Sequence, residues 1–383
     1  RVAGRRVLFP VINATMNLTD NNTRLGWQER KAASFILTPF ACGSASLPSG
    51  DSQAGGAYVE SACYAGSQPG QLPPTDPGEK TGITLGGAMT ISGAAVSPAM
   101  GYHSSPATAF LMTLFNVRLG VWVPNPGYAQ AHPQDAGICR QASPGFAILP
   151  FLNELLGRAG AKRRFVYLSD GGHFENLGLY EMIRRRCRFI ILSDAAADPD
   201  CRFGDLGNAV RKIKIDLGVD IEFPPIRIAP RGKADAGTTS FALGRISYPE
   251  AAGDPERCGW LLYLKPTYLE DLPVDVRAYA AANSLFPHEP TSDQWFSESQ
   301  FESYRRLGEH LMSQFRPARQ DQPVTLEALF LQARARLLPG PAASSAGHCG
   351  PAGEAPGALD GRQTGLEVLL AGPGSGPIPA PSP

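Results

Sequence analysis

An aspartate followed by two glycines, Asp170-Gly171-Gly172, is the part of the sequence best suited to chemistry. The residues before it, FVYLS (165–169), are apolar and strand-prone, so the carboxylate is expected where a strand ends. The two glycines allow a sharp turn and the close approach of another group. An aspartate placed in this way can orient or deprotonate a nucleophile. The alternative is that Asp170 only caps the helix that follows.

Neighbouring polar residues support weaker hypotheses. Asp194 follows a second apolar run (189–193) and is interpreted as a structural residue at a strand end. The spacing of Asp170, His173 and Glu175 is not that of a known metal site. A metal-dependent hydrolase that uses Asp170, His173 and Asp194 is nevertheless an alternative. We favour a site without metal or cofactor.

The usual signatures of a nucleophile or a phosphate-binding loop are missing from the sequence. No serine lies in the G-x-S-x-G motif that exposes a nucleophile between a strand and a helix. The nearest stretches, 43–46 and 50–54, do not fit it. There is also no G-x-x-x-x-G-K-[ST] loop and no G-x-G-x-x-G after a strand. The residues alone therefore identify a candidate base without its partner.

The elements around Asp170 follow the order strand, helix, strand, helix, strand. They are expected at residues 165–169, 176–186, 189–193, 206–217 and 219–223. This alternation predicts a parallel sheet with right-handed crossovers. The apolar runs at 165–169 and 189–193 are typical of strands that are covered on both faces.

The C-terminal half shows a different pattern. Residues 241–248 and 260–264 predict an antiparallel pair at the edge of the sheet. Residues 297–315 predict an amphipathic helix, and His288 just before it is interpreted as structural. Residues 43–80 are rich in Gly, Ser and Pro and predict a long loop or insertion, and 339–383 predict a disordered tail.

Composition excludes some functional classes. Lys+Arg and Asp+Glu both number 35, so the chain lacks the basic excess of a nucleic-acid-binding protein. Seven cysteines without a C-x-x-C pair do not indicate a disulfide framework or a zinc ribbon. No signal-peptide core follows Arg1, and residues 106–123 predict a buried amphipathic helix rather than a membrane span. We expect a location in the cytoplasm or at the cytoplasmic face of the membrane.

Several segments, in order, carry a family resemblance. The run YLSDGGHFENLGLYEMIRRRCRFIILSDAAADP (167–199) resembles the Asp-Gly-Gly region of patatin-like phospholipases, in a bacterial-type branch distantly related to cytosolic phospholipase A2. Other segments that resemble this branch are 6–18, 27–39, 88–102, 259–267 and 286–308. The resemblance thus extends over most of residues 6–308.

The resemblance implies both a fold and an activity. The fold would be an α/β, patatin-like three-layer fold with a mainly parallel central sheet. The activity would be hydrolysis of lipid or phospholipid esters by a Ser-Asp dyad, with Asp170 as the aspartate and Gly171 and Gly172 as its supporting turn. A membrane surface is a further expected partner. A non-catalytic lipid- or protein-binding module of the same family is the alternative.

This sequence departs from the family pattern before Asp170. The family's glycine-rich oxyanion loop and G-x-S-x-G elbow lie N-terminal to the segments that match. Gly86-Gly87 lacks the basic residue that follows that loop in the family, so it is not assigned to the oxyanion site. We therefore expect residues 1–338 to be the C-terminal part of an acyl hydrolase domain without its nucleophile-bearing part. On this expectation the chain alone is inactive.

Overall fold

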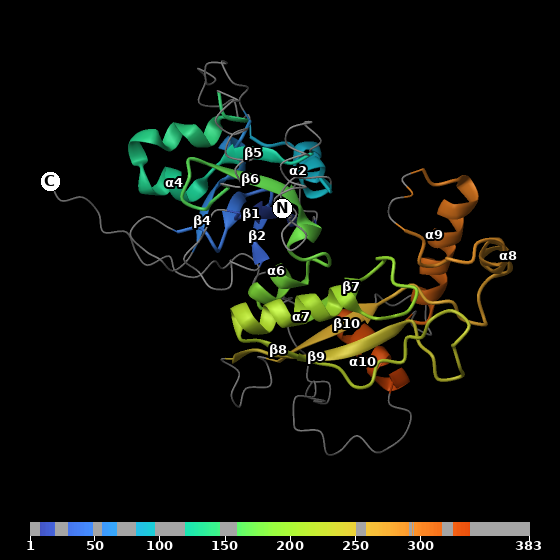
Figure 1. Ribbon diagram of the computed structural model, residues 1–383. Coiled ribbons are helices and arrows are strands. Elements are labelled where there is room, and N and C mark those ends of the chain that lie inside the picture. The colour runs from blue at the N-terminus through green and yellow to red at the C-terminus, as the bar shows by residue number, and fades with distance from the viewer. Residues whose placement is uncertain are drawn as a thin grey trace.

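The protein has a mixed α/β fold, described here from a computed structural model (Figure 1). In the described part of the chain, the strands form a six-stranded and a four-stranded sheet. The structure describes residues 8–19, 30–48, 56–66, 82–95, 119–145, 159–249, 258–290, 293, 295–315 and 325–337.

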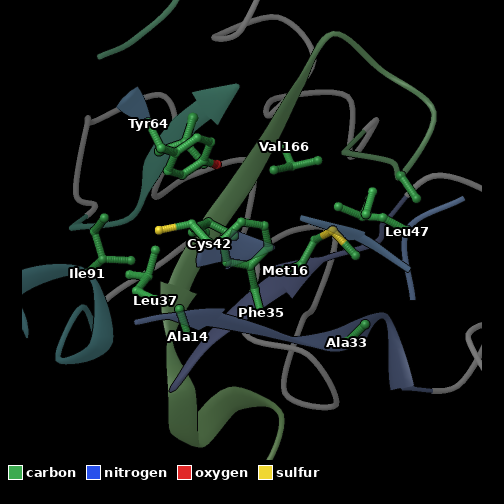
Figure 2. Close-up of a cluster of buried hydrophobic side chains, with 14 of the residues drawn as sticks. Ala14, Met16, Ala33, Phe35, Leu37, Cys42, Leu47, Tyr64, Ile91 and Val166 are labelled. Atoms are coloured by element: carbon green, nitrogen blue, oxygen red, sulfur yellow. The ribbon is translucent and has the colours of Figure 1, made fainter. Parts of the chain in front are cut away.

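The first sheet is antiparallel throughout, with the strand order β4-β3-β2-β1-β6-β5. Its strands are β1 (Ile12–Asn17), β2 (Ala32–Leu37), β3 (Ala41–Ser44), β4 (Ala57–Glu60), β5 (Val121–Pro124) and β6 (Phe165–Asp170). The central strands β1 and β6 come from distant parts of the sequence, and their register places Ala14 opposite Asp170. One face of this sheet supports a core that includes Met16, Phe35 and Val166 (Figure 2).

The second sheet has the order β7-β10-β9-β8. Its strands are β7 (Phe189–Ser193), β8 (Asp220–Glu222), β9 (Phe241–Ser247) and β10 (Cys258–Leu264). The β7–β10 pair is parallel, and the other two pairs are antiparallel. The predicted antiparallel β9–β10 pair is found, but both strands lie inside the sheet and not at its edge.

Among the residues that the structure describes, β6 and β7 do not form the mainly parallel central sheet expected from the sequence. β6 and β7 belong to different sheets, and β6 lies between two antiparallel neighbours. Its apolar sequence reflects burial on both faces, because Tyr167 and Trp122 form a small cluster on the side away from the main core. β7 alternates between buried and exposed residues, and Ile191 is 42% exposed. Apolar runs therefore located the strands but did not specify the direction of their neighbours.

Helices cover both faces of the second sheet. α6 (Leu179–Arg184) and α7 (Gly204–Leu217) share a core with one face, and α10 (Leu326–Leu337) packs against the other. Gly218 follows the last residue of α7, and its φ of 66° is the left-handed conformation that suits glycine at a helix terminus. Figure 1 shows α6 and α7 between the two sheets.

The other helices lie outside this central region. They are α2 (Leu85–Ser92), α4 (Pro126–Ala131), α8 (Val274–Ala282), α9 (Glu298–Ser313) and the 3-10 helices η1 (Ser61–Cys63), η3 (Pro133–Arg140) and η4 (Gly171–His173). The predicted helix at 297–315 is confirmed as α9. Ser297 precedes its first residue and caps it, because the Ser297 hydroxyl accepts the backbone N–H of Gln300.

Polar contacts join the first sheet to α6 and α7. Ser34 of β2 donates a hydrogen bond of 2.7 Å to the buried carboxylate of Glu181 on α6. Arg30, just before β2, forms an ion pair of 2.6 Å with Asp216 on α7. These contacts fix α6 and α7 against β2 and the segment just before it.

Three predicted segments have different outcomes. Within 43–80, the described residues contain the end of β3, all of β4 and η1, so these parts are not loop. Of the helix expected at 106–123, residues 106–118 lie outside the described part, and 121–123 belong to strand β5. The tail at 339–383 also lies outside it. No helix within the described ranges combines the length and the apolar character needed to cross a membrane.

Candidate active site at the end of β6

Asp170 is the last residue of β6, and its side chain is half-buried. One carboxylate oxygen, Oδ1, accepts the backbone N–H of Gly172 at 2.7 Å. This is the capping interaction that the alternative interpretation of Asp170 predicted. Within the described part of the chain, Oδ2 has no hydrogen-bond partner. The turn therefore fixes one oxygen and leaves the other available to accept a proton.

Gly171 brings the turn against β1. A Cβ atom at this position would lie 2.7 Å from the backbone oxygen of Asn13, so a larger residue does not fit without movement of the backbone. The same Asn13 oxygen accepts the hydroxyl of Ser92, at the end of α2, at 2.7 Å. Thr15 donates to the Gly171 carbonyl at 3.2 Å. The first glycine of the motif is therefore required for close approach.

A chain of side chains lies beside the turn. Ser169 is fully buried, and its hydroxyl oxygen is 2.8 Å from Nδ1 of His173. Asn17 of β1 donates to the same oxygen at 2.8 Å. The other ring nitrogen of His173, Nε2, lies 3.1 Å from the carbonyl oxygen of Ala95. His173 therefore links β6 to the segment after α2.

The Ser169–His173 pair has the separation of a nucleophile and its base. Ser169 is 0% exposed, however, so a substrate carbonyl cannot reach its hydroxyl in this conformation. Its hydroxyl also takes part in two hydrogen bonds within the protein. We conclude that Ser169 is a structural partner of the turn and not the nucleophile.

Buried charges support the start of α6 beside the turn. Glu175 accepts the backbone N–H groups of Leu177 and Tyr180 at 2.6 and 3.0 Å. Burial raises the pKa of Glu175, and these backbone donors oppose the shift. Lys212 of α7 donates to the carbonyl of Phe174, and burial lowers the pKa of this lysine to about 8. Glu175 and Lys212 are buried and bind backbone groups next to the turn, so they stabilise the residues that follow it.

Asp194 belongs to a separate buried cluster at the end of β7. Its Oδ2 accepts the hydroxyl of Tyr263 at 2.6 Å and the ammonium group of Lys265 at 3.2 Å, and its Oδ1 accepts the N–H of Ala196. The Lys265 and Asp194 side chains are 1% and 2% exposed. Burial lowers the pKa of the nearby His288, and the charge of Lys265 acts in the same direction.

The predicted residues therefore fall into two groups. Asp170, Gly171, Gly172 and His173 share one turn, whereas Asp194 is held by Lys265 and Tyr263 in the second sheet. The metal alternative fails because its third ligand is in this other cluster. Within the ranges that the structure describes, no three His, Cys, Asp or Glu side chains are placed to hold a metal ion.

Sequence reasoning missed the partners of the turn. Asn17 is separated from Ser169 by 152 positions, and nothing in the local pattern connects them. His173 was considered as a ligand of the alternative metal site, with no link to Ser169 or Asn17. The one usable signal was the alternation of polar and apolar residues in INATMN (12–17), which indicates a strand with a polar face.

No protein-family model matches the chain, and no curated protein matches it. Among solved structures, human GIVD cytosolic phospholipase A2 matches with a TM-score of 0.44 and 15% sequence identity. The match covers 85% of this chain and 44% of that chain, so this chain spans less than half of the neighbour's length. Membership of the patatin-like family stays a prediction from the sequence.

Proposed function

We propose that this chain provides the aspartate of a lipid acyl hydrolase of the patatin-like phospholipase type. The observation that carries the proposal is the state of Asp170. A half-buried carboxylate stands at the end of a strand, one oxygen is fixed by a backbone N–H, and the other has no partner among the described residues. The family resemblance of residues 167–199 supports the same assignment.

In the proposed reaction, a serine hydroxyl attacks the carbonyl carbon of a lipid ester while Asp170 accepts the hydroxyl proton. The tetrahedral intermediate then expels the alcohol, which takes that proton, and an acyl-serine ester remains. Water then attacks this ester and gives one proton to Asp170. Asp170 returns that proton to the serine oxygen as the fatty acid is released, so the serine hydroxyl and the carboxylate are both regenerated. The serine is not among the residues placed at the turn. It comes from a part of the protein that the structure does not describe.

The test is Asp170→Asn in the whole protein that the gene encodes, with hydrolysis of a phospholipid in mixed micelles as the assay. The amide keeps an oxygen that can accept the Gly172 N–H, so the melting temperature should not change. Loss of the base should lower the turnover about 100- to 10,000-fold. Asp200→Asn is the matched control, because Asp200 is exposed and pairs only at the surface with Arg202.

Labelling with a fluorophosphonate provides a second readout, because this reagent phosphonylates activated serines. The wild-type protein should be labelled at one serine, and Asp170→Asn should be labelled much more slowly. Normal turnover and labelling in Asp170→Asn would contradict the assignment. Lipid binding by a wild-type protein that neither hydrolyses esters nor reacts with the reagent would favour the non-catalytic module instead.

A further inference from the structure

We infer that His173 is a positioning residue for Asp170, and that it acts through Ser169 and Asn17. This inference rests on the proposed function, because it concerns how the base of that reaction is held. The side chains flank Asp170 on both sides in the sequence: Ser169 precedes it, and His173 ends the turn that follows it.

The proton positions in this network follow from the chemistry of its members. A backbone carbonyl can only accept, so the contact between Nε2 of His173 and the Ala95 oxygen places the ring proton on Nε2. Nδ1 of the neutral ring is then an acceptor, and the Ser169 hydroxyl must donate to it. The oxygen of Ser169 in turn accepts from the Asn17 amide. Each contact therefore has one donor and one acceptor.

The network is attached to the same segment as the backbone of Asp170. The backbone N–H of Asp170 donates to the carbonyl of Ala94 at 3.3 Å, and the His173 ring contacts the carbonyl of the next residue, Ala95. The turn is thus tied twice to the residues that follow α2. This double attachment fixes where the free carboxylate oxygen lies relative to that segment.

One feature of the network is unfavourable for stability. Asn17 is 1% exposed, and its Oδ1 is buried without a partner in the part of the chain that the structure describes. Burying an acceptor without a partner is costly, and such groups are rare in native proteins. The side-chain amide nitrogen of Asn17 donates to the Ser169 hydroxyl oxygen and, at 3.4 Å, to the Tyr167 carbonyl. A role of this network in positioning Asp170 explains why Asn17 is kept despite its unfavourable burial.

Two substitutions of His173 separate its two contacts. The amide oxygen of an asparagine takes the place of Nδ1, so His173→Asn keeps the acceptor for Ser169. The amide nitrogen of a glutamine takes the place of Nε2, so His173→Gln keeps only the contact with Ala95. We expect kcat for phospholipid hydrolysis to fall about 100-fold in His173→Gln, since small misplacements of a catalytic group have effects of this size. KM should not change, and His173→Asn should recover most of kcat.

Ser169→Ala removes the same hydrogen bond with the smallest change in volume, so the inference is testable even if a His173 variant does not fold. Ser169→Ala should have the same kcat as His173→Gln. The double variant Ser169→Ala/His173→Gln should have a kcat no lower than that of either single variant. His132→Gln is the control for the substitution itself, because His132 stacks on Tyr128 away from the turn.

The outcomes separate the two proposals. Wild-type kcat in His173→Gln and Ser169→Ala, with an inactive Asp170→Asn, overturns the positioning role and leaves the proposed function standing. Equal losses of kcat in both His173 variants, together with lower melting temperatures, mean a purely structural role and also overturn it. Full activity in Asp170→Asn, or no activity in the wild-type protein, overturns the proposed function and this inference with it.

Discussion

Removing the charge of Lys265 should destabilise the second sheet more than any surface substitution. Lys265→Met keeps the length of the side chain but removes an ammonium group that is 3.2 Å from Asp194 Oδ2 and 3.8 Å from Asp198 Oδ2. The side chains of Lys265 and Asp194 are 1% and 2% exposed, so water cannot replace the lost partner. Among the described residues, Asp194 would then keep the neutral donors Tyr263 and Ala196.

The expected cost follows from burial of this pair. Removing one member of a buried ion pair typically costs about 3–5 kcal/mol, because the other charge stays buried without compensation. The double variant Lys265→Met/Asp194→Asn removes both charges. It should therefore be clearly more stable than the sum of the two single costs predicts. Urea unfolding followed by circular dichroism measures all three free energies of unfolding.

The control is the same substitution in an exposed ion pair. Lys214 lies 2.7 Å from Asp220, and the two side chains are 55% and 51% exposed. Lys214→Met should cost about 0–1 kcal/mol, as for other surface pairs. The reasoning is refuted if Lys265→Met costs no more than Lys214→Met, or if the costs of the two single variants in the buried pair are additive.

Three other predictions concern packing, the contact between layers, and pH. Gly171→Ala should destabilise the protein by about 1–3 kcal/mol in thermal unfolding, because the new methyl group collides with the backbone of β1; Gly137→Ala, which meets nothing within 4 Å, should have a much smaller effect. Arg30→Gln should cost about 1.5–3 kcal/mol through loss of its charged hydrogen bonds to Asp216, and should raise amide exchange in α7. Burial lowers the pKa of His288, so the folded state binds fewer protons than the unfolded state, and stability is lost as the pH falls through the ordinary pKa of histidine, near 6.5, toward the lowered value. His288→Gln should flatten this part of the urea stability profile between pH 7 and pH 5, and an unchanged slope would contradict this explanation.

The sequence predicts elements better than it predicts their partners. Two apolar runs predict β6 and β7, and these strands are found within one residue of the expected limits. The sheet to which each belongs is set by contacts with distant segments, and apolar content carries no information about that choice. One of the two partners of β6 is β1, which starts 153 residues earlier in the chain. The prediction that β6 and β7 are parallel strands of one sheet was inferred from the order of the elements, and it was wrong.

The candidate site shows the same division. The Asp170-Gly171-Gly172 turn could be predicted because its residues are adjacent and glycine has specific backbone properties. The contact of Gly171 with Asn13, which explains the first glycine, depends on the β1–β6 register. The role of Ser169 was likewise not predictable, because its partner Asn17 lies on that other strand.

The β1–β6 pairing also sets the order of events during synthesis. β1 can pair with β2 as soon as both have left the ribosome, because they are close in the sequence. The other edge of β1 stays unpaired until β6 has been synthesised. At a translation rate of about 5–20 residues per second, synthesis of the intervening residues takes roughly 8–30 s. Throughout that interval β1 presents unpaired N–H and C=O groups, which can template association with another chain. The nascent protein therefore has a period of aggregation risk that ends only when Asp170 takes its place opposite Ala14.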